Sequence, residues 1–366
     1  MRVTIVGREF PPAISGIGDH TDLLAAELVR LGHDVTVVCR APGEQRETFT
    51  VLPVRSDFDA RGGAELARTV ASTRPDAIIW QYNPFSFGRR GLALGAGRFA
   101  RALKAVAPLI VSAHELWFPW GRNRARGFLW AVSQRLQTRA VLRAAAHTVV
   151  TTDRRLGDLP RGLAASVIPI GANIEPGSSG SGREHLGIPD DAFVVAHFGS
   201  VGPGRDLGPV VDAVATLRER GIDARLLLAG NTGPFEHPAS LNGSLIATGT
   251  GSRGEVSRVL ASADVYVHPD RVGPAPGRRG SLAAALAHGL ALVAYDGPDR
   301  DRRLESGRNC VLVGADAGDV TRALEALALD PGRRRLLGEA LQQTYEQTFA
   351  WHRVGGAFDA LLGALR

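Results

Sequence analysis

The sequence contains few cysteines and no long apolar run. Cys39 and Cys310 are the only two cysteines, and both lie inside apparent strands. This pattern favours buried thiols in a reducing compartment, and it argues against a disulfide framework or a zinc site. No apolar stretch is long enough to span a bilayer. Met1 leads directly into an expected strand, so we expect no signal peptide and a cytoplasmic protein.

Lysine is almost absent, although the chain is basic. Of the 43 lysine and arginine residues only Lys104 is lysine, and with 37 acidic residues the formal net charge is +6. A GC-rich genome explains the preference for arginine without any function. The positive charge still favours anionic partners such as nucleotide phosphates or acidic lipid surfaces. The basic residues are scattered and form no zinc-finger or RNA-binding pattern, so we expect no nucleic-acid partner.

The length and patterning of the chain predict two α/β domains. A chain of 366 residues exceeds the usual size of a single core, and its 44% hydrophobic content is that of a globular protein. Short apolar runs alternate with helical patterns in both halves, which predicts two Rossmann-like domains with parallel sheets that face a central cleft. Strands are expected at 2–6, 34–39, 49–53, 76–80, 109–112 and 148–151, and again at 193–198, 224–228, 244–247, 265–268, 290–294 and 310–313.

The domain boundaries follow from a Pro/Gly/Ser-rich stretch and from the last helical pattern. Residues 175–184 (EPGSSGSGRE) have the composition of a linker or flexible loop. We therefore predict an N-terminal domain over 1–174 and a C-terminal domain over 175–345. One final helix is expected over about 334–362, and its end, within 346–366, is expected to cross back to the first domain.

The segment from Arg278 to Gly297 is the most informative of the second half. Arg278 and Arg279 precede Gly280 and Ser281, and Ser281 stands where a helix N-cap is expected. A helix N-terminus presents unpaired N–H groups and the positive end of a dipole, and two arginines add bidentate donors. The pattern predicts a phosphate site. The alternative is an ordinary turn and helix with surface arginines.

A second glycine-rich loop follows the expected strand at 193–198. Glycines at positions 199, 202 and 204 allow the backbone to approach a ligand closely. Arg205 comes just before a helix, where it can reach a diphosphate. Together with Ser281 and the paired arginines it predicts one diphosphate pocket built from two loops. A solvated arginine is the alternative.

In the first half, the loop after the first strand contains Gly16 and Gly18 and leads into a helix with a predicted cap at Asp19 or Thr21. It is not a GxGxxG fingerprint, so a nicotinamide cofactor is not supported. The loop is expected to line the cleft, where His20 can contact a substrate. A surface or capping role is the favoured alternative for His20.

Two further loops follow expected strands and are expected to face the same cleft. His114 and Glu115 follow the strand at 109–112, and a histidine there can donate or accept a proton near neutral pH. Gln81 and Tyr82 begin the segment 81–90 (QYNPFSFGRR), which is expected to supply amides and aromatic walls on the acceptor side. Packing within the loops is the alternative for both segments.

The region from Arg122 to Arg143 is basic and has aromatic residues nearby. Trp117, Trp120 and Phe128 are among these residues. The pattern resembles a basic amphipathic surface that can touch anionic lipid. The alternative, which we favour, is an aromatic-packed helix with solvated arginines.

The ordered set of motifs resembles the family-4 glycosyltransferases of the GT-B fold over nearly the whole chain. The matching pieces are FPPAISGIGDHT, GHDVTVV, SAHE, VIPIGANI, FGSVGPGRD, ASADVYVHPD and AALAHGLALVA. The resemblance implies a retaining, hexosyltransferase-type enzyme that uses a nucleotide-diphosphate sugar and needs neither metal nor cofactor. It implies that Arg205 binds the diphosphate and that His114 is the cleft histidine. It also implies that Gly16 and Gly18 lie near the donor phosphate and the acceptor, which is a small molecule, a glycan or a lipid-linked group.

The chain departs from this family at two carboxylates. The family commonly carries Glu-x7-Glu, and aligned on AHGLALVA these places are Pro276 and Ala284. The basic residue usually found five positions before Arg205 is Ser200. A bacterial subset with QY-x-P and RRGSL-x-AALAHG sequences is more similar, so the loss of the glutamates is expected to be a trait of that subset.

Three functions therefore remain open at this point. The first is a sugar transferase. The second is other chemistry on the same fold, by a pseudo-glycosyltransferase that joins non-sugar rings or a nucleotide-sugar epimerase. The third is a non-catalytic nucleotide-sugar-binding partner subunit. The features of the diphosphate pocket favour the first two.

Overall fold

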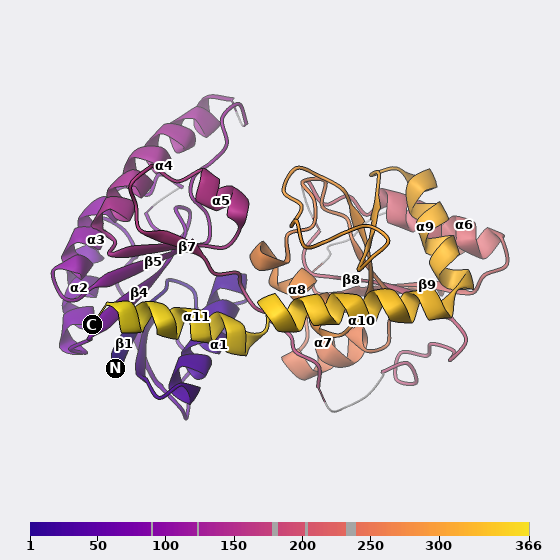
Figure 1. Ribbon diagram of the computed structural model, residues 1–366, viewed down its shortest axis with the longest axis horizontal. Coiled ribbons are helices and arrows are strands. Elements are labelled where there is room, and N and C mark those ends of the chain that lie inside the picture. Colours follow the sequence, from indigo (N-terminus) through magenta and orange to yellow (C-terminus); the bar gives the residue numbers. More distant parts are fainter. Residues whose placement is uncertain (89–90, 123, 178–181, 202–203, 232–238, 366) are drawn as a thin grey trace. The chain divides into compact units, whose positions relative to one another are not determined.

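The computed structural model describes residues 1–88, 91–122, 124–177, 182–201, 204–231 and 239–365. Gly202, the end of segment 81–90 and part of the expected linker therefore lie outside the described residues. The chain forms two compact units. The N-terminal unit consists of Met1–Pro169 and Trp351–Arg366, and the C-terminal unit is Ile170–Ala350. Figure 1 shows a twisted sheet with covering helices in each of them.

The N-terminal unit is built on a seven-stranded parallel sheet. The strand order is β3-β2-β1-β4-β5-β6-β7, so β1 and β4 are central neighbours. Side chains of β4 and β5 are buried along their whole length, as expected for parallel strands covered on both faces. The strands are β1 Arg2–Val6, β2 Asp34–Arg40, β3 Thr50–Val54, β4 Ala77–Tyr82, β5 Leu109–Ala113, β6 His147–Val150 and β7 Ala165–Val167.

In the described residues of this unit, six helices accompany the sheet. They are α1 Gly16–Arg30, α2 Gly63–Ser72, α3 Ala96–Lys104, α4 Arg124–Ala144, α5 Asp153–Gly157 and α11 Trp351–Ala364. The chain returns to this unit through α11, which packs against α1 (Figure 1). Trp351, Val354 and Phe358 of α11 are buried in the same apolar cluster as Leu24 and Leu28 of α1. The last helix is therefore part of the core of the N-terminal unit.

The C-terminal unit repeats the architecture with a six-stranded parallel sheet of order β10-β9-β8-β11-β12-β13. Its strands are β8 Phe193–Phe198, β9 Ala224–Ala229, β10 Leu245–Gly249, β11 Val265–His268, β12 Ala291–Tyr295 and β13 Val311–Val313. Its helices are α6 Gly208–Glu219, α7 Arg253–Leu260, α8 Gly280–Ala287, α9 Ala317–Leu329 and α10 Pro331–Thr348, with short 3-10 turns η1 Ala239–Leu241 and η2 Pro276–Arg278.

Two predicted helix starts and one predicted helix are wrong. Helix α1 is capped by Ser15, whose side chain accepts from the Gly18 N–H, so the expected glycine loop is the first turn of the helix. Helix α8 begins at Gly280, and its N-cap residue is Arg279, so Ser281 lies inside the first turn. The helix expected over 334–362 is two helices, because the chain leaves α10 at Phe349.

Candidate functional site

Two neighbouring strands of the C-terminal unit deliver the predicted donor residues to one place. β8 and β11 pair in parallel, so they end at the same edge of the sheet. The loop after β8 carries Arg205, and the segment after β11 carries Asp270. These two residues form an isolated antiparallel backbone bridge. Carboxyl ends of parallel strands are the usual location of ligand sites in open α/β sheets.

The carboxylate of Asp270 lies between two of the predicted arginines. Its side chain is only 4% exposed. Arg279 donates from Nη2 to its Oδ2 at 3.0 Å, and Nε of Arg205 lies 3.9 Å from the same oxygen. Arg205 also donates from Nη1 to the carbonyl of Ser200 at 2.6 Å. Arg205 and Arg279 are therefore brought together and held in fixed directions.

Ser281 belongs to the same cluster. A Cβ atom added at Gly199 would lie 3.3 Å from Oγ of Ser281 and 3.8 Å from Nη1 of Arg205. Gly199 has a φ of +119°, so a larger residue would be strained as well as crowded. Glycine at this position allows the strand end, the serine and the arginine to meet.

The electrostatics of the cluster favour an anion. Burial, together with the charges of Arg278 and Arg205, lowers the pKa of Arg279 to about 10, against the opposing effect of Asp270. Arg279 remains charged at neutral pH. Burial lowers the pKa of His197 to about 4, and Arg205 adds to the effect. One buried carboxylate thus faces several positive groups, and a bound anion would relieve their repulsion.

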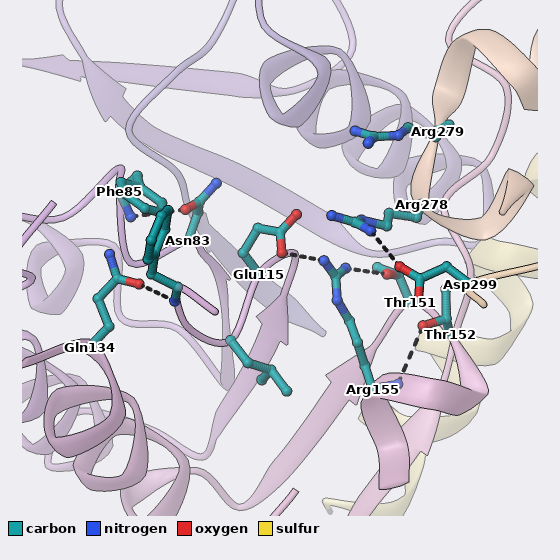
Figure 2. A network of polar contacts seen from close by, with 12 residues as sticks. Asn83, Phe85, Glu115, Gln134, Thr151, Thr152, Arg155, Arg278, Arg279 and Asp299 are labelled. Carbon is teal, nitrogen blue, oxygen red and sulfur yellow. Dashed lines mark hydrogen bonds and ion pairs between the residues drawn. The ribbon is translucent and has the colours of Figure 1, made fainter. Parts of the chain in front are cut away.

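Helix α8 adds backbone donors to this charge. Its first turn starts at Gly280, and no side chain caps it. The first N–H groups of a helix have no partner inside the helix and form the positive end of its dipole. Arg278 precedes the helix and pairs with Asp299 at 3.1 Å (Figure 2). The helix start and the arginines together form an arrangement suited to phosphate oxygens.

A second group of predicted residues comes together in the N-terminal unit. Nε2 of His114, just after β5, donates to Oε1 of Gln81 at the end of β4, with the two atoms 2.7 Å apart. The ring of His20 lies edge-on, 5.1 Å from that of His114. In the described part of the chain, Nε2 of Gln81 and both ring nitrogens of His20 have no hydrogen-bond partner. These polar atoms can receive a ligand group.

The low basicity of His114 limits what it can do. Burial lowers the pKa of His114 to about 3, and the charge of Arg155 contributes. Burial also lowers the pKa of His20 well below its ordinary value, with His114 as a second cause. Both rings are neutral at pH 7. A base this weak removes a proton poorly, so a hydrogen bond to a substrate hydroxyl is the more effective role.

Glu115 and Tyr82 have different environments. Glu115 forms an ion pair with Arg155, which also donates to Thr151 at 2.9 Å (Figure 2). Tyr82 is fully buried, and its hydroxyl lies 2.7 Å from that of Thr138 on α4. Tyr82 therefore packs between the sheet and a helix, whereas the partly exposed carboxylate of Glu115 remains accessible.

The two predicted glycines of α1 also differ. A Cβ atom at Gly16 would meet nothing within 4 Å. A Cβ atom at Gly18 would lie 3.3 Å from Cα of Phe10, which is a tight contact with the preceding loop. The close packing of the loop explains Gly18, and open space surrounds Gly16.

Sequence analysis missed several polar residues of the C-terminal unit. His268 ends β11 and Asp270 follows it in the HPD sequence, and this position at the end of a buried strand was the available signal. Asn173 was also missed. Within the described residues its buried Oδ1 has no hydrogen-bond partner, and a Cβ atom at Gly280 would lie 3.3 Å from it.

Comparison with known families identifies the class of protein. Residues 15–165 match the glycosyl transferase 4-like domain, and residues 192–330 match the domain of glycosyl transferases group 1. The chain is a glycosyltransferase of the GT-B fold. This confirms the predicted fold and the predicted hexosyltransferase class of enzyme, and the other two functions left open by the sequence are not favoured. The RRGSL-x-AALAHG subset stays a prediction.

Relatives and solved structures agree with this assignment. The glycosyltransferase is 26% identical to the GDP-mannose-dependent alpha-(1-6)-phosphatidylinositol dimannoside mannosyltransferase of Mycobacterium tuberculosis, over 100% of this chain and 97% of the relative. It is 28% identical to the D-inositol 3-phosphate glycosyltransferase of Actinosynnema mirum, over 55% of this chain and 52% of the relative. Its fold resembles sucrose-phosphate synthase from Thermosynechococcus elongatus, with a TM-score of 0.74, 17% identity and coverage of 100% and 98%.

Anabaena HepE in complex with UDP-glucose is another structural neighbour, with a TM-score of 0.73, 16% identity and full coverage of both chains.

Across the residues that the structure describes, no helix combines the length and apolar character needed to cross a membrane. In the same residues, no three His, Cys, Asp or Glu side chains are grouped to hold a metal ion.

Proposed function

We propose that this glycosyltransferase moves a hexosyl group from a nucleoside-diphosphate sugar to an acceptor hydroxyl, with retention of the anomeric configuration. The observation that carries the donor class is the convergence of Arg205, Arg279 and Ser281 beside the start of α8. Guanidinium groups bind phosphate oxygens through paired hydrogen bonds, and helix N–H groups add further donors. The arrangement suits two adjacent phosphates better than a neutral ligand.

The same arginines supply the charge compensation that a divalent cation would otherwise give. Arg205 and Arg279 lie on either side of one buried carboxylate, so the cluster keeps a net positive charge. We therefore propose that the enzyme needs no metal and no other cofactor. Turnover should be the same with excess EDTA as with added magnesium.

In the proposed reaction the acceptor oxygen forms a bond to the anomeric carbon on the face from which the diphosphate leaves. The bond between that carbon and the phosphate oxygen breaks, and the hydroxyl proton passes to the departing diphosphate. Arg205 and Arg279 stabilise the charge that grows on the leaving group. We assign His114 to holding the acceptor hydroxyl, because its pKa of about 3 makes it a poor base.

Relatives suggest which substrates to test first. One is named for GDP-mannose and a phosphatidylinositol dimannoside, and another for inositol 3-phosphate. HepE has been solved with UDP-glucose. We propose a hexose donor of the GDP or UDP class and an acceptor that is a phosphorylated polyol or a lipid-linked glycan. The proposed site of action is the cytoplasm.

The decisive experiment incubates the full chain with GDP-mannose, UDP-glucose and UDP-N-acetylglucosamine, each with inositol phosphate and with phosphatidylinositol vesicles. Release of nucleoside diphosphate and formation of a glycosylated product support the proposal, and proton NMR of the product gives the anomeric configuration. An inverted product would refute retention. If the wild-type chain neither binds nor turns over any donor, the proposed donor class is wrong.

A further inference from the structure

Helix α4 of the N-terminal unit presents a row of apolar side chains to solvent. Phe128, Leu129 and Leu136 are each 60% exposed, and Val132 is half-buried. Positions 128, 129, 132 and 136 fall on one side of a helix, so the row is continuous. Opposite it, residues such as Ala131 are buried against the unit. We call this row the α4 face.

Trp120 extends the α4 face beyond the start of the helix. Its side chain is 53% exposed, and its ring centroid lies 5.6 Å from that of Phe128. The guanidinium of Arg135 lies over the Trp120 ring, 4.2 Å from its centroid. An exposed tryptophan next to a cationic side chain is typical of surfaces that bind at the boundary between lipid headgroups and acyl chains.

Basic residues surround the α4 face, and acidic residues are absent from this stretch of sequence. Arg122, Arg126, Arg139 and Arg143 are exposed along the helix and just before it. Residues 116–152 contain no aspartate or glutamate. The partner of this surface should therefore offer both negatively charged groups for the arginines and an apolar layer that the exposed side chains can enter.

We propose that the α4 face docks on the surface of an anionic phospholipid membrane. Trp120, Phe128 and Leu129 would enter the headgroup boundary, and the arginines would contact lipid phosphates. A second copy of the chain fits less well, because two such faces would bring like charges together. Nucleic acid offers phosphates but nothing for the exposed apolar row.

The structure distinguishes the aromatic and apolar residues of α4 that pack inside the unit from those that are exposed. We favoured an aromatic-packed helix, and Trp130 indeed packs on Phe85 and Phe118. Phe128 and Leu129, two neighbours of Trp130 along the same helix, have no such cover. Membrane docking does not require the donor site, so this proposal and the proposed transfer reaction succeed or fail independently.

The test is co-sedimentation of the full chain with vesicles of phosphatidylcholine alone and with vesicles of phosphatidylcholine that contain about 30 mol% phosphatidylglycerol. We expect binding only to the anionic vesicles, and weaker binding as salt rises. Arg126→Glu with Arg139→Glu should lower the partition coefficient by at least roughly fivefold for each arginine. Phe128→Ser with Leu129→Ser should lower it at least about tenfold.

Matched controls come from α10 of the C-terminal unit. Leu336 is 62% exposed and Arg333 is exposed, so Leu336→Ser and Arg333→Glu remove the same chemistry elsewhere. They should leave vesicle binding unchanged. All four altered positions on α4 are exposed, so circular dichroism and thermal unfolding should match the wild type.

Three results would overturn the proposal. Wild-type protein that binds neither kind of vesicle is one. Equal binding by the wild type and by the Phe128→Ser, Leu129→Ser variant is another. The third is a wild-type dimer in light scattering that becomes a monomer in that variant without any vesicle binding, which would assign the α4 face to self-association.

Discussion

The guanidinium of Arg279 lies 3.0 Å from the buried carboxylate of Asp270. This contact fixes the direction of an arginine that precedes helix α8. Arg205 approaches the same carboxylate at 3.9 Å, so one negatively charged group lies next to two positively charged groups. Loss of the carboxylate would leave both arginines in unopposed repulsion. Asp270 therefore positions the two arginines without neutralising them, and this keeps the site ready for an anion.

Replacing Arg205 by alanine should weaken donor binding. A hydrogen bond to a charged group contributes about 1.5–3 kcal/mol, so the dissociation constant for the nucleoside diphosphate should rise by roughly 10- to 150-fold. Titration calorimetry measures the effect. Arg220→Ala, a surface change at the C-cap of α6, should bind as the wild type does. Unchanged affinity of the Arg205→Ala variant would remove Arg205 from the donor site.

Replacing His114 should affect turnover more than donor binding. Its pKa of about 3 predicts that kcat will show no histidine titration between pH 5.5 and 8. His114→Ala should lower kcat by about 5- to 150-fold, because a buried hydroxyl left without its hydrogen bond costs ~1–3 kcal/mol, and it should not change the affinity for the nucleoside diphosphate. Steady-state rates across pH check both points. A wild-type rate in the variant, or a titration near pH 6.5 that the variant lacks, would contradict the assigned role.

Two glycine substitutions in α1 should have opposite effects. Gly16→Ala should raise stability by about 0.5–1 kcal/mol, because Gly16 lies in the helix with open space around it. It should nonetheless reduce turnover if ligand approaches there. Gly18→Ala should lower stability, because its Cβ would press on the backbone of Phe10. Thermal unfolding and activity of both variants provide the test, and Gly16→Ala with full activity would exclude a ligand contact.

Acid should destabilise the C-terminal unit through buried histidines. Burial holds the pKa of His268 well below 6.5, and that of His197 at about 4. Unfolding returns both groups to a pKa near 6.5, so the unfolded state binds more protons. The free energy of unfolding therefore falls as pH drops from about 6.5 towards 4, by up to ~1.4 kcal/mol per pH unit for each histidine.

His268→Leu tests this pH dependence directly. Neither ring nitrogen of His268 has a partner within the described residues, so leucine removes the titrating group without breaking a hydrogen bond seen there. The difference in urea unfolding free energy between pH 7.5 and 5.5 should shrink by about 1–2 kcal/mol. His185→Leu, at an exposed position of the same unit, is the control. An unchanged difference in the His268→Leu variant would disprove the linkage.

The fold was largely predictable because its strands are buried on both faces. The segments of β4 and β8 consist mostly of apolar residues, and every residue in them is buried. Such short, mostly apolar runs are typical of parallel strands that are covered on both faces. β7 (Ala-Ser-Val) was missed because only one of its three residues is large and apolar, whereas the equally short β13 is Val-Leu-Val. The break between α10 and α11 was missed because the two residues between the helices, Phe349 and Ala350, are neither glycine nor proline. Both are buried, so tertiary packing decides where the chain turns.

The candidate site was only partly predictable. Arg205 and Arg279 could be found because each follows a strand in a glycine-containing loop. Asp270 was missed although it follows β11, because its role depends on a bridge to Arg205, which is distant in sequence. The start of α8 was misplaced for a local reason. Ser281 is a good capping residue by type, but the observed N-cap, Arg279, comes two residues earlier.

The last prediction concerns the ribose of the donor. Ala284 is fully buried among apolar residues of α8 and cannot accept a hydrogen bond there. The sequence alone indicates Ser281, the backbone carbonyls of 272–280 and the more distant Glu305 as candidate acceptors. Glu305 is exposed and pairs with Arg308 at 2.9 Å, whereas Asn173 offers a buried oxygen beside Gly280. We therefore predict that Asn173 accepts from a ribose hydroxyl.

Asn173→Ala should raise the dissociation constant for GDP or UDP by about 5- to 150-fold, since an unpaired hydroxyl costs ~1–3 kcal/mol. The 2′-deoxy nucleotide separates a ribose contact from a general loss of structure. If Asn173 binds the 2′-hydroxyl, the variant and the wild type should bind the deoxy nucleotide equally. Ser281→Ala, measured in the same way, tests the acceptor expected from sequence. An equal loss of affinity for both nucleotides in Asn173→Ala would show that Asn173 only supports the turn at Gly280.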